Sequence, residues 1–374
     1  MSLTWFAPHV LKQLEEVIKT GKIGICPGPI KILNPMPSGA SWQPKNYCDR
    51  FKLVIPYGGH TVDWDVILQA SSPECPPDFI FTTCPNFVSF DQIKTILDWD
   101  PEKPDSLLTI LRELIRHYQK YQASRLEKYS RVQFEYSTLT QQTDVTDDDV
   151  EVHVTDEKEG PINFLIRLGT QFNGIPKIYK NDNGDTALLL VTFNSLEGTK
   201  ITPKLCLPPK IEHALGSPLS WRIPAFSSDG CLMDYVPFVQ ESLKKRVEMV
   251  AYNFEKRMEY LFVFLDHFEG AYLEFDRDLA SKATFLFEQN GFFFIFHIDV
   301  PQNFPMGKPS FTFRSIYHST FEKPYSTTVM NYPYNQGWSA KMMLEHAVEF
   351  IQQYVDVFQH NSVQNGVSAL TAIA

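Results

Sequence analysis

The sequence predicts an α+β fold made of repeated units, in each of which an antiparallel β-meander packs against helices. The chain has 374 residues, which is too long for one core, because single cores stop growing at roughly 250–300 residues. The order helix, β-meander, proline-rich elbow, helix occurs near both ends of the chain. The composition, 43% hydrophobic and 21% charged, allows packed cores throughout.

The N-terminal part begins with a helix and continues into a meander. Apolar residues at helical spacing predict a helix over Pro8–Thr20 that ends at Gly21. A second apolar stripe predicts a helix over about Ser106–Lys128. Between them lie three strand-like runs and a hairpin signal. These are Phe51–Pro56, Thr61–Leu68 and Phe79–Phe81, with the turn Tyr57-Gly58-Gly59-His60 between the first two.

The central part starts with an acidic stretch without aromatic residues, Thr143–Gly160. We interpret it as an exposed loop or mobile linker, because such a composition buries little apolar surface. Turn residues such as Asn181-Asp182-Asn183-Gly184 separate the short strands predicted beyond it. These strands are Phe164–Leu168, Ala187–Phe193 and Lys204–Leu207, and a proline- and glycine-rich passage, Pro208–Gly230, follows.

The C-terminal part repeats the order of elements. Sustained apolar faces predict helices over about Phe238–His267 and Ser339–Phe358, with strands at Thr284–Glu288 and Gly291–Val300. The residues after His360 are small and polar, and we expect them to fray.

These patterns predict four segments. They are an N-terminal domain over residues 1–130, a central segment over 131–235 with the acidic loop 143–160, a C-terminal domain over 236–360 and a flexible tail over 361–374. The boundary between the central and C-terminal parts is open, because the helix over Phe238–His267 could close one and begin the other.

Two proline-rich elbows align at identical offsets, Pro73, Pro77 and Phe81 with Pro305, Pro309 and Phe313. Each proline fixes its own φ and restricts the residue before it, so each elbow should be a stiff corner that anchors a phenylalanine in the core. A tryptophan then precedes the final helix of each copy. The predicted fold-defining residues are Pro73, Pro76, Pro77, Phe81, Trp99, Pro101, Pro305, Pro309, Phe313 and Trp338. Two unrelated corners are the alternative, since 26 prolines offer chance matches.

The first elbow, followed by Trp99-Asp100-Pro101 ahead of a helix, resembles the ubiquitin-conjugating (E2) fold. Stretches in order over nearly the whole chain resemble the BRE family, whose members carry E2-variant (UEV) domains. The resemblance implies tandem UEV-like domains with a degenerate RWD-like or UEV-like segment between them. The stretches are CDRFKLVIPYGG (48–59), PPDFIF (76–81), KIEHALG (210–216), IPAF (223–226), CLMDYVP (231–237), HIDVP (297–301) and NYPY (331–334).

BRE-family proteins belong to the deubiquitylase assembly BRISC and its nuclear relative ARISC, in which a JAMM (MPN+) zinc metalloprotease cleaves lysine-sixty-three-linked ubiquitin chains. The resemblance implies a scaffold that bridges an Abraxas-family pseudo-protease, this metalloprotease and a von Willebrand-like adaptor, the last on the C-terminal UEV-like domain. It also allows ubiquitin and a docked metabolic enzyme, serine hydroxymethyltransferase, as partners. Cytoplasmic and nuclear localisation is the corresponding expectation.

The sequence predicts no catalytic, cofactor-binding or metal-binding residue. An E2 needs a nucleophilic cysteine, and the second copy has none, because Cys231 is the last in the chain. In the first copy, Cys84-Pro85-Asn86 echoes the His-Pro-Asn of active E2 enzymes, but the expected nucleophile region, about Asp91–Thr95, contains no cysteine. The spacing of the six cysteines shows no Cys-x-x-Cys zinc pair, so we expect reduced thiols. They are Cys26, Cys48, Cys75, Cys84, Cys206 and Cys231.

Other chemistries lack their motifs as well. A JAMM site needs a His-x-His pair, which is absent; His297 with Asp299 is the nearest approach, and we interpret His297 as a satisfied strand residue. The net charge of −10 argues against binding nucleic acid or an anionic membrane. No apolar run approaches the roughly 20 residues that span a bilayer.

Four functions remain open on the sequence. The first is a scaffold, favoured by repeated E2-like units without a nucleophile and by 14% aromatic residues. A free-standing ubiquitin-binding module and a groove that binds proline-rich peptides are the alternatives. An active E2 is disfavoured by the missing cysteine.

Overall fold

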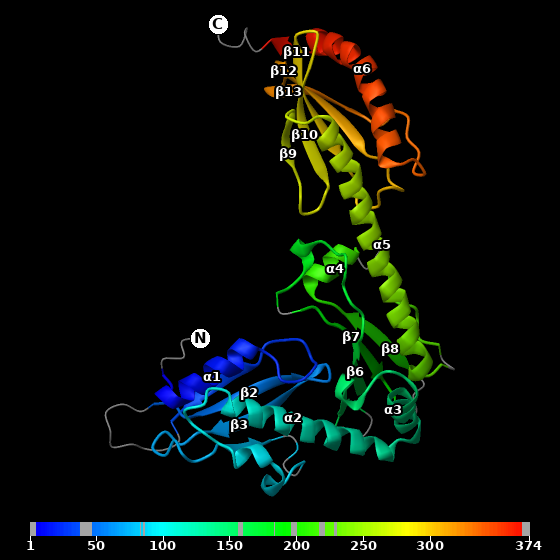
Figure 1. Ribbon diagram of the computed structural model, residues 1–374. Helices are drawn as coiled ribbons and strands as arrows, with labels where there is room; N and C mark the ends of the chain where they lie inside the picture. The colour runs from blue at the N-terminus through cyan, green and yellow to red at the C-terminus, as the bar shows by residue number, and fades with distance from the viewer. Residues whose placement is uncertain are drawn as a thin grey trace. The chain divides into compact units, whose positions relative to one another are not determined.

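The computed structural model describes residues 5–37, 47–82, 84, 87–155, 160–182, 184–195, 200–216, 221–227 and 230–368. Helices and antiparallel sheets alternate along the chain (Figure 1), which confirms the α+β prediction. The chain divides into two compact units. Unit 1 comprises Met1–Thr170, Thr186–Leu207 and Ile223–Glu241, and unit 2 comprises Gln171–Asp185, Pro208–Arg222 and Ser242–Ala374. The finer division into 1–130, 131–235 and 236–360 stays a prediction.

Unit 1 opens with a helix, a four-stranded antiparallel meander in the order β1-β2-β3-β4, and a second helix. Their bounds are α1 Pro8–Thr20, β1 Lys31–Met36, β2 Arg50–Tyr57, β3 His60–Ile67, β4 Asp78–Phe81, the 3₁₀ turns η1 Phe90–Gln92 and η2 Lys94–Ile96, and α2 Ser106–Ser124. Helix α1 has the predicted bounds and buries Val10, Leu14 and Val17, which share one face. Gly21 adopts φ 73° and ends it.

The β2–β3 hairpin has the predicted turn. Gly58 and Gly59 both have positive φ, 54° and 80°, as type I′ turns require. Tyr57 pairs with His60 across this turn. Alternate residues of β2 are buried against the helices, so the strand follows the period of two that its sequence suggests.

The rest of unit 1 consists of a second sheet and a helix beside it in the sequence. It includes two elements that the sequence analysis missed. Its strands run in the order β5-β6-β7-β8, all antiparallel. The elements are η3 Arg125–Lys128, α3 Ser130–Gln142, η4 Asp147–Asp149, β5 Val150–Val154, β6 Ile162–Leu168, β7 Ala187–Phe193 and β8 Ile201–Cys206. Helix α3 and strand β5 were not predicted.

The interpretation of Thr143–Gly160 as an exposed acidic loop is therefore wrong over Val150–Val154, which forms strand β5. Val150, Val152 and Val154 are at most 2% exposed and pair with β6. This valine alternation is a strand pattern, which the neighbouring aspartates obscured in the composition. Residues 156–159 of the stretch, and residues 369–374 of the predicted tail, lie outside the described residues.

A buried carboxylate joins the two sheets of unit 1. Glu151 on β5 is 2% exposed, and its carboxylate accepts hydrogen bonds from the backbone N–H groups of Ile25 (2.7 Å), Cys26 (3.4 Å) and Gly58 (2.8 Å). Leu165 and Leu188 of the second sheet pack against Ile25 and Cys26. The sheets thus share a small core as well as these hydrogen bonds.

Unit 2 contains the second meander. Its elements are η5 Lys177–Tyr179, α4 Pro209–Leu215, most of α5 Leu232–His267, β9 Tyr272–Phe275, β10 Lys282–Gln289, β11 Phe292–Asp299, β12 Ser310–Thr320, β13 Lys323–Val329, α6 Ala340–Asn365 and β14 Val367–Ser368. The sheet has the order β13-β12-β11-β10-β9, and β14 pairs with β12. Helix α5 begins six residues before the predicted start, with Pro237 inside it, and α6 continues to Asn365 instead of fraying after His360.

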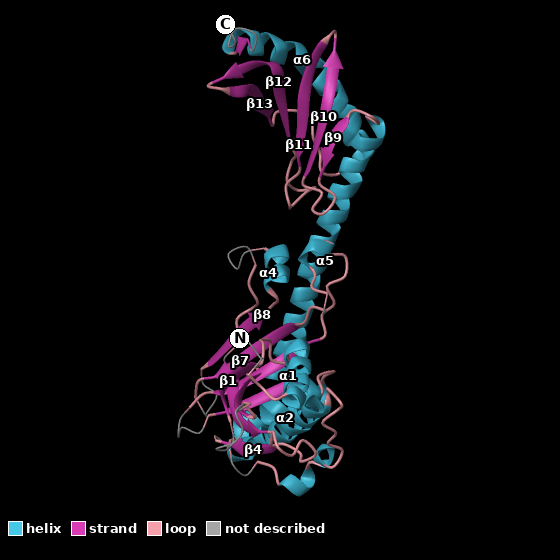
Figure 2. Ribbon diagram, turned by 90° about the vertical axis from the view of Figure 1, so that its left-hand side faces the viewer, coloured by secondary structure: helices cyan, strands magenta, loops and turns pink. Residues whose placement is uncertain are grey.

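Both helices cover one face of this sheet. Phe264 of α5 lies 6.5 Å from Phe311, and Phe358 of α6 lies 5.6 Å from Phe313, measured between ring centroids. Figure 2 shows α5 and α6 beside the strands. No helix within the described residues is long and apolar enough to cross a bilayer.

The internal repeat is confirmed by strand register. Pairs Trp64–Phe81 and Ile67–Asp78 of β3 and β4 correspond to Phe296–Phe313 and Asp299–Ser310 of β11 and β12. Every counterpart lies 232 positions later, as 313 does after 81. The hairpin turn follows the same offset, because Asn290 and Gly291 also have positive φ, 52° and 79°. The two elbows are therefore equivalent corners of equivalent meanders, and not chance matches.

Candidate functional site

The first elbow connects β3 to β4. Pro73 is half-buried, Pro77 is buried and Pro76 between them is exposed. The indole N–H of Trp99 donates a hydrogen bond to the Pro73 carbonyl at 2.9 Å. Phe81 is 7% exposed and meets Trp64 edge-on at 5.4 Å. The elbow is thus fixed at both ends by aromatic side chains.

The second elbow, between β11 and β12, is fixed in a related way. Pro305 is half-buried and Pro309 is buried, matching the burial of Pro73 and Pro77 in the first elbow. The hydroxyl of Tyr332 donates to the Pro309 carbonyl at 2.7 Å, and the hydroxyl of Tyr334 donates to the Pro305 carbonyl.

Further aromatic contacts anchor the strand that leaves the second elbow. Phe313 is fully buried and contacts Phe296 edge-on at 5.1 Å. Tyr332 stacks on Phe311 at 4.1 Å and is 6% exposed, so it belongs to the core. It is therefore not available as a surface contact.

The remaining predicted elbow residues differ between the copies. The carbonyl of Pro101 accepts a long hydrogen bond (3.4 Å) from Gln13 of α1, whose side-chain oxygen accepts from Leu107 N–H at the start of α2. The Trp338 ring lies 4.3 Å from the His346 ring of α6, between ring centroids, at an interplanar angle of 30°. The two tryptophans therefore have different neighbours, and the fold-defining role of the ten residues as a set stays a prediction.

The Trp99–Pro73 hydrogen bond leads to a prediction. We expect Trp99→Phe to lower the free energy of unfolding by about 1 kcal/mol, the net value of one such bond. Urea denaturation followed by circular dichroism measures the change. Trp5→Phe is the matched control, because Trp5 is 68% exposed and its change should cost less than about 0.5 kcal/mol. Equal losses in both variants would contradict the role of the indole N–H.

Three of the cysteines lie in environments that suppress thiolate formation. Burial raises the pKa of the Cys26 thiol to about 11 and raises the pKa values of Cys48 and Cys231 as well. Cys84 is 7% exposed and hydrogen-bonded to Tyr118 of α2. Pro85 and Asn86, the rest of the tripeptide that echoes the E2 motif, lie outside the described residues.

Metal-binding groups are not found either. Within the described ranges, no cluster of three or more His, Cys, Asp or Glu side chains could hold a metal ion. His297 lies half-buried on the outer face of β11, and its Nδ1 is 3.0 Å from the Thr284 hydroxyl. This matches the interpretation of His297 as a satisfied strand residue.

The outer face of the unit 2 sheet carries the first candidate contact surface. Side chains on this face alternate with the buried phenylalanines, and several are large and apolar. Leu286, Ile295 and Arg314 form one row across β10, β11 and β12. We call this surface the open sheet face and define it by Leu286, Phe293, Ile295, Arg314 and Ile316. Leu286, Phe293 and Ile316 are 38%, 41% and 47% exposed, an apolar exposure that is typical of interaction sites.

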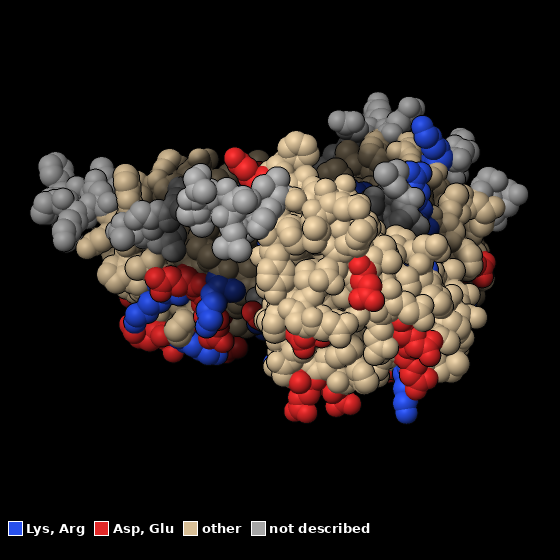
Figure 3. Space-filling view, turned by 90° about the horizontal axis from the view of Figure 1, so that it is seen from above, with Lys and Arg blue, Asp and Glu red and all other residues tan. Residues whose placement is uncertain are grey.

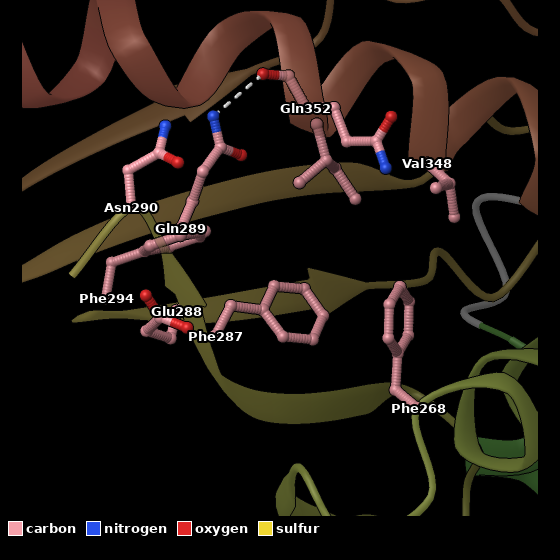
Figure 4. Close-up of a pocket in the computed structure, with 9 residues that line it drawn as sticks. Phe268, Phe287, Glu288, Gln289, Asn290, Phe294, Val348 and Gln352 are labelled. Carbon is pink, nitrogen blue, oxygen red and sulfur yellow. Dashed lines mark hydrogen bonds between the residues drawn. The ribbon is translucent and has the colours of Figure 1, made fainter. Parts of the chain in front are cut away.

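A second candidate lies at the tip of the β10–β11 hairpin. Here a cavity of about 640 Å³ opens between the hairpin, the end of α5 and α6. Figure 4 shows Phe268, Phe287 and Phe294 on one side and Val348 and Gln352 of α6 on the other. A hydrogen bond from Gln289 Nε2 to the Gln352 carbonyl (3.3 Å) crosses it. We call this cavity the hairpin notch.

The tip of the equivalent hairpin in unit 1, at Gly58 and Gly59, packs against the second sheet of the same unit. There the turn packs on the second sheet so closely that a Cβ on Gly58 would lie 2.9 Å from His153, and one on Gly59 would lie 2.9 Å from Leu190. At the turn of unit 2, a Cβ on Gly291 would have no described neighbour within 4 Å. The hairpin tip is thus covered by a neighbouring sheet in unit 1 and is open at Gly291 in unit 2.

The sequence analysis did not find either surface. In the stretch Phe292–Asp299, both faces carry apolar residues, so hydrophobicity alone could not separate the buried from the exposed ones. Figure 3 shows small mixed groups of acidic and basic side chains and no broad basic patch on the face in view. The expectation that the chain does not bind nucleic acid stays a prediction.

Comparison with known proteins assigns the family. The family model described as "Brain and reproductive organ-expressed protein (BRE)" matches residues 6–319. Two relatives are both named "BRISC and BRCA1-A complex member 2". The one from Branchiostoma floridae is 40% identical over 377 residues, covering 95% of this chain and 98% of its own. The one from Danio rerio is 36% identical over 378 residues, covering 98% of both. The resemblance drawn from the short stretches is thereby confirmed, and this chain belongs to the BRE family.

Proposed function

We propose that this chain is a non-catalytic scaffold subunit of a BRISC-like deubiquitylase complex. The observation that carries the proposal is the match along nearly the whole chain to relatives named as members of the BRISC and BRCA1-A complexes. The chain would bridge an Abraxas-family pseudo-protease, a JAMM zinc metalloprotease and a von Willebrand-like adaptor. The complex would cleave lysine-sixty-three-linked ubiquitin chains in the cytoplasm and the nucleus.

The absence of catalysis is supported by the environment of Cys84. A ubiquitin thioester needs an accessible thiolate, and a thiol buried in an apolar core and bonded to a tyrosine hydroxyl is neither accessible nor activated. The region in which an E2 nucleophile is expected, about Asp91 to Thr95, forms the 3₁₀ turns η1 and η2 and contains no cysteine. On this proposal, the E2-like meanders serve as binding platforms.

The partner surfaces follow from the geometry of unit 2. The open sheet face and the hairpin notch expose apolar side chains that water solvates poorly. The corresponding hairpin tip in unit 1 is covered by the second sheet, through Gly58 and Glu151. The family resemblance implies that the von Willebrand-like adaptor binds the C-terminal UEV-like domain, and these exposed surfaces would give it room to do so. Ubiquitin or a docked serine hydroxymethyltransferase would bind the assembled complex.

The alternative is a free-standing ubiquitin- or peptide-binding module. The hairpin notch favours it, because an apolar cavity flanked by the amides of Gln289, Asn290 and Gln352 could hold a short peptide. A scaffold should form a stoichiometric complex that survives salt. A lone receptor should instead bind ubiquitin chains or peptides by itself.

Co-expression with Abraxas-like and JAMM partners, followed by size-exclusion chromatography, separates these functions. The scaffold proposal expects one stoichiometric peak that cleaves lysine-sixty-three-linked diubiquitin and loses this activity on zinc chelation. A chain that elutes alone and leaves the partners' activity unchanged would move the assignment to a free-standing module.

A variant at Cys84 tests the non-catalytic assignment. We expect Cys84→Ser in the reconstituted complex to retain full diubiquitin cleavage, because no step passes through this thiol. The rate of cleavage, followed by gel electrophoresis, is the measurement. The hydroxyl is smaller than the thiol in a buried site, so thermal unfolding of the variant is the control. A large loss of activity in a variant that is still folded would reopen the catalytic question.

A further inference from the structure

Unit 2 contains a second, larger cavity that the scaffold function does not require. It has a volume of about 810 Å³ and lies beside the middle of α5. Its walls come from η5, the end of α4, the link between β9 and β10, and the second elbow at Pro305. All these segments belong to the same compact unit. We call it the arginine pocket.

The charged side chains that line this pocket are all positive among the described residues. Arg246 and Arg257 line it, and no aspartate or glutamate is among its described lining residues, although the whole chain carries a net charge of −10. Arg246 already donates to the Leu215 carbonyl from Nε at 2.8 Å. The carboxylate of Asp276 acts on the charge of Arg257 from a distance, and it accepts hydrogen bonds from the backbone N–H groups of Leu279 and Ser281.

Arg257 is the group that lacks a complete set of partners. It is only 6% exposed, and its Nη1 donates to the Gln302 carbonyl at 2.9 Å. Its Nε is buried and has no hydrogen-bond partner among the described residues. A buried donor without a partner costs about 1–3 kcal/mol, so a ligand that accepts a hydrogen bond from this N–H would recover that cost. Burial also lowers the pKa of this guanidinium, a change that a bound anion would reverse.

The free edge of Arg257 selects the kind of anion. Nε and Nη2 form one edge of the planar guanidinium, and that edge pairs side-on with the two oxygens of a carboxylate. The Phe254 ring lies 5.8 Å from the guanidinium carbon and helps to fix its orientation. One buried positive charge matches the single charge of a carboxylate better than the double charge of a phosphate.

The rim of the pocket indicates a polypeptide. Met249, Tyr252 and Met306 stand at its edge and are 52%, 50% and 78% exposed. Methionine and tyrosine side chains of this kind are typical of surfaces that are covered by another chain. A free carboxylate of a few atoms would reach the guanidinium and leave this apolar rim in water.

We propose that the arginine pocket binds an acidic segment of a partner polypeptide, with the carboxylate of an aspartate or glutamate pairing with Arg257 and neighbouring apolar side chains covering the methionine rim. This site is separate from the open sheet face and the hairpin notch. Its existence does not depend on which complex the chain joins.

Two matched peptide libraries displayed on phage test the proposal against the full-length chain. Both contain random dodecapeptides, with a central glutamate fixed in one and a central glutamine in the other. We expect the glutamate library to be enriched roughly tenfold over the glutamine library on the wild-type chain. Arg257→Gln should abolish this preference, whereas Lys341→Gln, which removes an exposed charge on α6 outside the pocket, should retain it.

Further measurements test the proposal even if Arg257→Gln is unstable. Met306→Ala leaves Arg257 in place and should weaken binding of the selected peptides several-fold in fluorescence anisotropy, with unchanged thermal unfolding. Equal enrichment of both libraries, or a preference that survives Arg257→Gln, would overturn the proposal. Complete displacement of the peptides by millimolar acetate would identify a free carboxylate as the ligand, and would overturn it as well.

Discussion

Phe313→Ala is expected to lower the free energy of unfolding by about 3–5 kcal/mol, the range measured for truncating a fully buried phenylalanine. Phe313 is 0% exposed and is surrounded by the rings of Phe294, Phe296, Tyr354 and Phe358, at 5.0 to 5.8 Å. These rings come from the sheet and from α6. Removing the side chain would therefore leave a cavity where the sheet and the helix meet.

Urea denaturation gives the size of this effect, and hydrogen exchange locates it. We expect faster exchange in β11, β12 and α6, with the strands of unit 1 unchanged. Phe293→Ala is the matched control, because Phe293 lies on the adjacent strand but on the open sheet face, and is 41% exposed. It should cost less than about 1 kcal/mol. Similar losses for the two variants would mean that the second elbow does not anchor the core as described.

Parts of unit 2 and of the first meander could be predicted from local signals, whereas β1, α4, β9 and β13 were not predicted. The turn at Gly58-Gly59, the end of α1 at Gly21 and the two elbows each rest on glycine or proline, whose backbone preferences act within a few residues. The repeat could be found for the same reason, because the elbows carry identical offsets. Local rules failed where tertiary packing decides the outcome.

Two errors illustrate this limit. Strand β5 follows three aspartates, so composition suggested a solvated loop, whereas pairing with β6 buries Val150, Val152 and Val154. Helix α5 begins at Leu232 although Pro237 lies inside it. Because proline has no backbone N–H, it is usually found in the first turn of a helix. Here the helix begins one turn earlier, and Glu135 of α3 caps that turn by accepting a hydrogen bond from the Leu232 N–H (2.6 Å).

The candidate contact surfaces could not be predicted for a related reason. The orphan Nε of Arg257 exists only because α5, Gln302 and the second elbow converge in space, and no short-range pattern marks it. The open sheet face is likewise defined by which residues the helices leave uncovered. Sequence patterns identify what must be buried more readily than what is left to bind partners.

Glu151→Ala is expected to destabilise unit 1 by about 3 kcal/mol or more, because it removes the carboxylate that accepts hydrogen bonds from three buried backbone N–H groups. Ile25, Cys26 and Gly58 would keep buried donors without this carboxylate, and each such donor costs about 1–3 kcal/mol. Asp148→Ala, three residues earlier and exposed, is the matched control and should stay within about 0.5 kcal/mol of wild type. Urea denaturation measures both, and a Glu151→Ala loss no larger than the control's would contradict the proposed link between the two sheets.

The pH dependence of a milder variant, Glu151→Gln, tests the state of the carboxyl. Burial raises the pKa of Glu151 above its ordinary value of 4.5, and the backbone hydrogen bonds from Gly58, Ile25 and Cys26 act in the opposite direction. An acid whose pKa is higher in the folded than in the unfolded state contributes its full stability below the unfolded value, and loses this contribution as the pH rises through the folded value. The stability difference between the wild-type chain and Glu151→Gln should therefore narrow as the pH rises from below 4.5 towards neutrality. If the difference in stability widens as the pH rises, the three N–H donors lower the pKa of Glu151 by more than burial raises it. The two sheets would then be joined by an ionised carboxylate.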